Sequence, residues 1–221
     1  MHKGTTFCSK NLIVLLHTSN IIVMIEIYEL QLTFPTGLVF SNLSLAINTG
    51  THTCISGPSG SGKSSILKIL QGYLEPDSGK IKIDGQEVTK KNISEIRSAM
   101  AYVPQNIHLP VNNGMELIRM LACAIDLNAT RMLLVRLGLD EDMLERAFDA
   151  MSGGQKQRVI IAICLSLGRK IILLDEPTAS LDDEAIGKLI DVIRQLKEVT
   201  VISASHNPEW KDAANFNLIL K

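Results

Sequence analysis

Short runs of apolar residues alternate with polar, glycine-containing turns along most of the chain. Tyr28, Leu30, Leu32 and Phe34 fall on one face of an extended segment, which predicts a half-buried strand. A hairpin is expected over 80–88, because the Asp-Gly pair at 84–85 favours a tight two-residue turn. Other strands are predicted over 42–47, 51–56, 100–103, 171–174 and 200–203.

Helical patterns lie between these strands. One helix is expected from Lys63 to about Gly72, and another from an apolar stripe at positions 186, 189, 190, 193 and 196. The run Ile171–Leu174 is apolar throughout, which is typical of a strand buried on both faces. Strands that alternate with helices in this way predict an α/β fold with a mainly parallel sheet.

Two segments differ from this pattern. Residues 106–150 lack β-branched runs and predict an α-helical subdomain inserted into the α/β core. Its apolar positions with helical spacing are Met115, Ile118, Leu121, Ala122, Met132, Leu133, Val135, Leu137 and Leu139. Residues 1–23 hold apolar runs far shorter than the roughly 20 residues that a membrane-spanning helix needs. We interpret them as an N-terminal extension, with Met24 as an alternative start, before a domain over 24–221.

Composition narrows the function classes. The 221 residues are 46% hydrophobic, which is enough for a sizeable core. A net charge of −1 gives no electrostatic reason to expect nucleic acid as a partner. The four cysteines form no CxxC pair, so a reducing compartment fits better than a disulfide framework.

A glycine-rich loop carries the first candidate chemistry. The segment Gly57-Pro58-Ser59-Gly60-Ser61-Gly62-Lys63-Ser64-Ser65 contains G-x-x-x-x-G-K-[ST] between a predicted strand and a predicted helix. Glycines let backbone N–H groups turn toward phosphate oxygens, and the helix directs its positive end to the same place. Lys63 is expected to reach the β- and γ-phosphates of ATP, and Ser64 to ligate Mg²⁺. The alternative, a flexible Gly/Ser turn, explains neither the lysine nor the flanking elements.

The apolar strand over 171–174 ends in two carboxylates, Asp175 and Glu176. Strand ends in doubly wound sheets open into the ligand crevice. Asp175 is a candidate Mg²⁺ ligand, and Glu176, which points to the other side by strand alternation, is a candidate base for an attacking water. Acidic residues also end strands in solvent, so the two carboxylates alone are a weak signal. Together with the phosphate loop they indicate a nucleotide site.

The segment Met151-Ser152-Gly153-Gly154-Gln155-Lys156-Gln157-Arg158 resembles the signature sequence of ABC ATPases, with Met151 where that family usually has Leu. Other motifs of the family follow in order. Gln105 resembles the glutamine of the Q-loop, the segment 179–182 with Asp182 resembles the D-loop, and His206 resembles the switch histidine. Phe34 resembles the aromatic residue that stacks on adenine, although core packing is the alternative for it. Asn207 stands where the family often has Asp.

The resemblance implies a P-loop NTPase core with an N-terminal antiparallel β subdomain and the inserted helical subdomain. It implies a head-to-tail homodimer, with ATP and Mg²⁺ between the phosphate loop of one chain and Ser152, Gly153, Gly154 and Gln155 of the other. Glu176, His206, Lys63 and Gln105 are then the catalytic residues, and Ser64, Gln105 and Asp175 hold the metal.

For function, the resemblance implies a peripheral ATPase at the cytoplasmic face of a membrane, coupled to integral membrane permease subunits. The alternative is a soluble ABC ATPase, such as one of iron–sulfur cluster assembly. The sequence leaves open the transported substrate, the direction of transport and the identity of the permease.

Overall fold

The computed structural model describes residues 4–7, 22–121 and 123–221. Its centre is a six-stranded sheet in the order β1-β10-β4-β9-β8-β7, and every pairing in it is parallel. The strands are β1 (Gly4–Phe7), β4 (His52–Ser56), β7 (Met100–Val103), β8 (Ile171–Asp175), β9 (Thr200–Ala204) and β10 (Phe216–Ile219). The predicted α/β fold with a mainly parallel sheet is confirmed.

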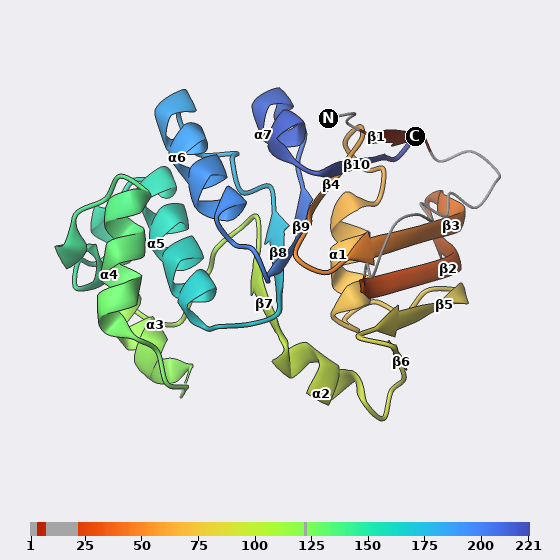
Figure 1. Ribbon diagram of the computed structural model, residues 1–221, viewed down its shortest axis with the longest axis horizontal. Helices are drawn as coiled ribbons and strands as arrows, with labels where there is room; N and C mark the ends of the chain where they lie inside the picture. The colour runs from red at the N-terminus through yellow and green to blue at the C-terminus, as the bar shows by residue number, and fades with distance from the viewer. Residues whose placement is uncertain (1–3, 8–21, 122) are drawn as a thin grey trace.

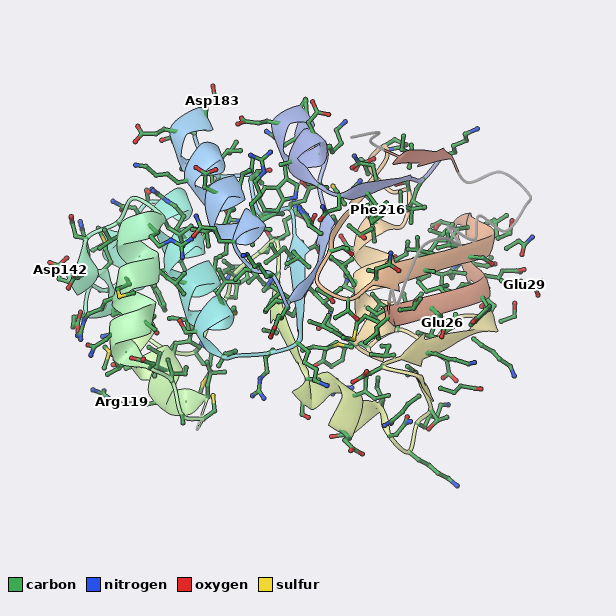
Figure 2. All side chains as sticks on the ribbon, viewed as in Figure 1. Glu26, Glu29, Arg119, Asp142, Asp183 and Phe216 are labelled. Carbon is green, nitrogen blue, oxygen red and sulfur yellow. The ribbon has the colours of Figure 1, made fainter. Side chains whose placement is uncertain are left out.

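A second, antiparallel sheet lies beside helix α1 (Figure 1). Its strands are β2 (Val23–Phe34), β3 (Gly37–Asn48), β5 (Ser78–Ile83) and β6 (Gln86–Glu87), in the order β3-β2-β5-β6. The predicted hairpin joins β5 to β6, and Asp84 and Gly85 have positive φ angles of 50° and 75°, as its tight turn requires. Figure 2 shows Glu29 at the outer edge of this sheet.

The prediction that Tyr28 shares a face with Leu30 and Leu32 is wrong. Strand β2 has register shifts between Ile27 and Leu30, and Glu29 has φ 46°. A bulge of this kind adds a residue and exchanges the two faces of the strand. Ile27 and Leu30 are buried on either side of the bulge, whereas Tyr28 is exposed.

Helices cover both faces of the parallel sheet. They are α1 (Lys63–Leu70), α2 (Ile93–Ser98), α3 (Gly114–Met120), α4 (Leu127–Arg136), α5 (Gly153–Ser166), α6 (Asp183–Arg194) and α7 (Pro208–Ala213), with the short 3₁₀ helices η1 (Glu141–Leu144) and η2 (Phe148–Ala150). Helices α3 and α4 form the predicted helical subdomain and lie far from the antiparallel sheet (Figure 1). Arg119 and Asp142 mark its outer edge in Figure 2.

The expected apolar face of α4 is partly wrong. Leu134 and Leu137 are fully buried, but Met132 and Val135 are 63% and 52% exposed. Helix α4 packs against α5 and η1, and its apolar residues that do not face these elements stay exposed. Leu121 is also exposed, and Ala122 lies outside the described residues.

The parallel sheet separates two cores. In β8, Ile172 and Leu174 face α5, α6 and the helical subdomain, while Ile171 and Leu173 face α1 and the antiparallel sheet. This alternation confirms that the strand is buried on both faces. It holds the carboxyl end of β8 rigidly in the middle of the molecule.

Of the predicted extension over 1–23, most lies outside the described residues. Its described part includes β1, a parallel edge strand beside β10 that the sequence pattern did not reveal. Strand β10 and the short helices α2 and α7 were not predicted either. The domain division at residue 24 stays a prediction.

Candidate active site

The phosphate loop and three other predicted site segments follow neighbouring parallel strands. The strands are adjacent in the order β4-β9-β8-β7, and all run in the same direction. Their carboxyl ends therefore meet at one edge of the sheet. The phosphate loop follows β4, His206 follows β9, Glu176 follows β8 and Gln105 follows β7.

These segments surround one cleft with a volume of about 750 Å³. Most of the phosphate loop lines it together with Gln105, Glu176 and His206, whereas Ser61, Asp175, Asp182 and the predicted site residues 152–155 do not. The lining residues are Phe34, Thr36, Gly57, Pro58, Ser59, Gly60, Gly62, Lys63, Ser64, Ser65, Gln105, Glu176 and His206. Phe34 is 37% exposed here, so it is not a core residue.

The phosphate loop keeps its shape through close packing. Gly62 has φ 91°, and a Cβ atom there would lie 2.5 Å from Val39 Cγ1, so only glycine fits. Helix α1 begins at the next residue, which directs its N-terminus toward the cleft. Lys63 Nζ donates hydrogen bonds to the carbonyl oxygens of Gly57 and Pro58, at 3.0 and 2.9 Å. The Ser61 hydroxyl is buried without a hydrogen-bond partner among the described residues.

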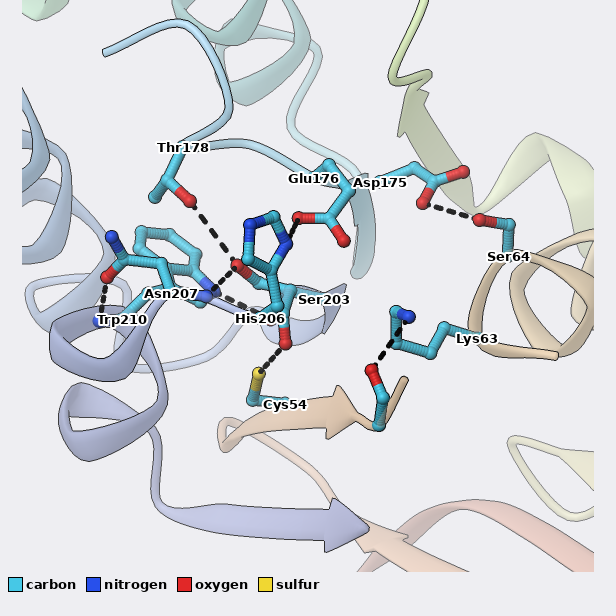
Figure 3. A network of polar contacts seen from close by, with 12 residues as sticks. Cys54, Lys63, Ser64, Asp175, Glu176, Thr178, Ser203, His206, Asn207 and Trp210 are labelled. Atoms are coloured by element: carbon cyan, nitrogen blue, oxygen red, sulfur yellow. Dashed lines mark hydrogen bonds and ion pairs between the residues drawn. The ribbon is translucent and has the colours of Figure 1, made fainter. Parts of the chain in front are cut away.

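Asp175 is held by two hydroxyl groups (Figure 3 shows the first). Ser64 Oγ donates to Asp175 Oδ1 at 2.8 Å, and Tyr102 Oη donates to Asp175 Oδ2 at 3.3 Å. Burial raises the pKa of Asp175, while the bonds from Ser64 and Tyr102 act in the opposite direction. Oxygen atoms from a hydroxyl and a carboxylate thus converge beside the phosphate loop, which is the ligand chemistry that Mg²⁺ prefers.

Glu176 and His206, which both line the cleft, contact each other (Figure 3). His206 Nδ1 lies 3.0 Å from Glu176 Oε2. The Glu176 side chain is 9% exposed, whereas that of His206 is 73% exposed. The Glu176 carboxylate is therefore largely shielded from water, next to a histidine that faces solvent.

The signature segment lies outside this cleft. Ser152 is the N-cap of α5: its Oγ accepts from Gln155 N–H, and Gln155 Oε1 accepts from Ser152 N–H. A Cβ atom on Gly154 would lie 2.5 Å from the Ser180 carbonyl oxygen, so glycine lets the helix pack on the predicted D-loop. Asp182 caps α6 by accepting from Ala185 N–H at 2.8 Å. Ser152 and Gly153 are exposed, so the helix end is open to a partner.

Some functional residues escaped the sequence analysis. Thr36 lines the cleft, Tyr102 contacts Asp175, and Gln157 Nε2 donates to the Glu176 carbonyl oxygen. Thr36 and Tyr102 lie outside the motifs quoted above, and Gln157 lies within the signature segment but was assigned no role there. Asn207 has a clear role: it caps α7 by accepting from Trp210 N–H, a task that Asp performs equally well.

Comparison with known proteins agrees with this geometry. The family model for ABC transporters matches residues 40–179. The chain is 35% identical to the energy-coupling factor transporter ATP-binding protein EcfA1 of Ligilactobacillus salivarius, over 82% of this chain and 68% of that protein. It is 34% identical to the phosphonates import ATP-binding protein PhnC of Thiobacillus denitrificans, over 82% and 77%. The chain spans between 51% and 80% of the length of such relatives.

A solved structure gives the same result. The ATP-binding cassette MJ0796, in a dimeric post-hydrolysis state bound to ADP and Pi, superposes with a TM-score of 0.77. It is 27% identical in sequence, over 90% of this chain and 94% of that one. The chain therefore belongs to the ABC transporter family, as an ATP-binding and ATP-hydrolysing subunit.

Proposed function

We propose that the chain is the motor subunit of a membrane importer. It works as a head-to-tail pair with a second ATP-binding domain, and permease subunits hold it at the cytoplasmic face of the membrane. The observation that carries this proposal is the division of the site. Lys63 and Glu176 line the cleft, whereas the exposed N-terminus of α5 at Ser152 lies outside it. A site divided in this way is complete only when two chains meet.

Within one chain, the cleft residues bind the nucleotide and activate water. Lys63 exchanges its bonds to Gly57 and Pro58 for the β- and γ-phosphates, since carbonyl oxygens are weaker partners for an ammonium than phosphates are. Glu176 accepts a proton from the attacking water. His206 leaves the Glu176 carboxylate and contacts the γ-phosphate, and Phe34 stacks on the adenine ring.

Ser64, Asp175 and Gln105 would hold Mg²⁺. The distance of 2.8 Å between Ser64 Oγ and Asp175 Oδ1 supports this assignment, because two oxygen atoms so close together can share one ion. When bound, Mg²⁺ supplies positive charge that offsets the charge of the phosphoryl group in transfer.

The partner chain completes the site with the N-terminus of its α5. The Ser152 N–H group already donates to Gln155 within its own chain. The first turn of the helix therefore offers the N–H groups of Gly153 and Gly154 to the γ-phosphate, with the positive end of a 14-residue helix behind them. Asp182 lies in the segment that packs against this helix end.

The import direction rests on the relatives. PhnC is named as a phosphonates import protein, and the thiamine protein ThiQ of Brucella abortus is likewise an import protein. These relatives are transport subunits, so the alternative of a soluble iron–sulfur cluster ATPase is not favoured. Among the described residues, no helix has the length and apolarity to cross a bilayer.

Fractionation and copurification test the proposal. A tagged chain expressed in its native cell is expected in the membrane fraction together with integral membrane proteins, and to leave that fraction when the permease gene is deleted. The ATPase rate per chain is expected to rise with protein concentration, because the site forms between chains. Recovery only from the soluble fraction, with a concentration-independent rate, would contradict both parts of the proposal.

A further inference from the structure

The backbone of Glu176 has an uncommon conformation. Its φ angle is 48°, in the left-handed region that residues other than glycine rarely adopt. Such a conformation persists only where surrounding contacts hold it. On one side, the Glu176 N–H group donates to the Ala204 carbonyl oxygen of β9 at 2.8 Å.

Gln157 holds the other side. Its Nε2 donates to the Glu176 carbonyl oxygen at 3.1 Å, from the second turn of α5. Gln157 is 4% exposed and Glu176 is 7% exposed, so water does not compete for this bond. The Ala179 N–H group donates to the same carbonyl at 3.2 Å. The peptide that follows Glu176 is therefore fixed by a buried side chain of the signature helix.

Packing does not explain a glutamine at this position. Gln157 Oε1 is buried without a hydrogen-bond partner in the described part of the chain. A buried acceptor without a partner costs free energy, and methionine would fill nearly the same volume without that cost. What glutamine adds over methionine is the bond from Nε2 to Glu176.

We propose that Gln157 is a positioning residue for Glu176. Its amide fixes the peptide after Glu176, and that peptide sets the direction in which the carboxylate enters the cleft. The orientation of the Glu176 carboxylate then depends on the position of the signature helix α5. This inference rests on the proposed role of Glu176 as the base, and it assigns a function to a residue that does not line the cleft.

Gln71 provides a matched control. It is 3% exposed, and its Nε2 donates to the Leu67 carbonyl oxygen at 2.9 Å, which is the same kind of bond. That bond lies at the C-terminal end of α1, outside the cleft. Gln71→Met and Gln157→Met thus remove equivalent contacts, and only the second contact reaches Glu176.

Steady-state kinetics of the two variants form the first test. Gln157→Met is expected to lower kcat about tenfold, the scale of loss that a misplaced catalytic group produces, and to leave KM for ATP within about twofold. Gln71→Met is expected to keep the kcat of the parent. If Gln157→Met does not fold, Gln157→Asn replaces it, because its amide is one methylene too short to reach the carbonyl. Equal kcat values for the Gln157 and Gln71 variants would overturn the inference.

The second test combines Gln157→Met with Glu176→Gln. If Gln157 acts through the Glu176 carboxylate, the double variant keeps the residual rate of Glu176→Gln, because the group to be positioned is already gone. A structural role would instead lower the residual rate by the same factor as in the parent. An inactive parent protein would contradict the proposed function itself, whereas an active parent with additive losses contradicts only the role of Gln157.

Discussion

Ser64 and Asp175 lie 111 positions apart in the chain, yet the Ser64 hydroxyl donates to Asp175 Oδ1 across 2.8 Å. The bond joins the first turn of α1 to the end of β8. It exists because β4, which leads into the phosphate loop, is separated from β8 only by β9 in a parallel sheet. The strand order therefore brings the phosphate loop and the acidic end of β8 together in one site.

Lys63→Ala is expected to lose most nucleotide binding and hydrolysis. Lysine is the only side-chain cation of the loop over 57–65, and its Nζ already lies within this loop. Calorimetric affinity for ATP is expected to fall at least about tenfold, or about 1.4 kcal/mol. Lys90→Ala, which removes a surface lysine paired with Glu75, is the control and keeps the affinity. Unchanged affinity in Lys63→Ala would remove the phosphate-loop assignment.

Ser152→Arg is expected to bind ATP like the parent but to lose turnover. The residue is exposed at the start of α5 and lies outside the cleft, so the change loses the α5 N-cap but leaves the nucleotide-binding residues of its own chain in place. Ser98→Arg, at an exposed position on α2, serves as the control and keeps normal turnover. Normal hydrolysis by Ser152→Arg at saturating ATP would contradict the proposed head-to-tail arrangement of the site.

Mixing Ser152→Arg with Lys63→Ala protein is expected to restore part of the activity. In a mixed pair, the intact phosphate loop of the first chain faces the intact signature of the second. One of the two composite sites is then whole. The rate of the mixture, compared with the summed rates of the separate proteins, measures this complementation.

His52 makes stability depend on pH in a predictable direction. It is 7% exposed, its Nε2 lies 2.8 Å from Ser203 Oγ, and burial lowers its pKa from 6.5 to about 4. Below pH 6.5 the His52 imidazole is protonated in the unfolded chain, whereas in the native chain it stays neutral until the pH approaches 4. Stability from this group is therefore complete above pH 6.5 and falls as the pH drops toward 4, by about 2 kcal/mol at pH 5.

Urea unfolding at about pH 7.5 and about pH 5 measures this loss. His52→Phe is expected to reduce the difference in unfolding free energy between the two pH values by about 2 kcal/mol, because the titrating group is gone. His108→Phe makes the same change at an exposed position and is expected to leave the difference intact. An equal pH dependence in His52→Phe and the parent would show that another group carries it.

Particular residues show why some features could be predicted from the sequence. The apolar run of β8 and the glycines of the phosphate loop are local signals, and both lie where the pattern places them. Tyr28 was misplaced because a bulge depends on a partner strand, and no pattern within one strand reveals it. Met132 is exposed because burial on α4 depends on which elements pack against it, and no pattern within the helix reveals that.

The candidate site shows the same division. Lys63, Glu176 and His206 lie in recognisable motifs, and the structure brings them to one cleft. Gln157 lies within the signature segment, but the motif does not reveal its contact with Glu176, because that contact joins α5 to the end of β8, 19 residues away. Contacts across elements of this kind come from topology, which the sequence expresses only indirectly.

Glu176→Gln is expected to give a stable ATP-bound dimer. The amide keeps the shape of the carboxylate and loses the base, so water is no longer activated. ATP still binds, since the phosphate loop and the Ser64–Asp175 pair are unchanged. Loss of a negative charge beside the γ-phosphate strengthens closure, and an uncleaved nucleotide keeps the two chains together.

Size-exclusion chromatography with ATP and Mg²⁺ is expected to show a persistent dimer for the variant and a transient one for the parent. Glu184→Gln, on an exposed helix surface, is the control and behaves like the parent. A monomeric Glu176→Gln protein that still hydrolyses ATP would show that another group, with His206 at 3.0 Å the nearest candidate, carries the chemistry.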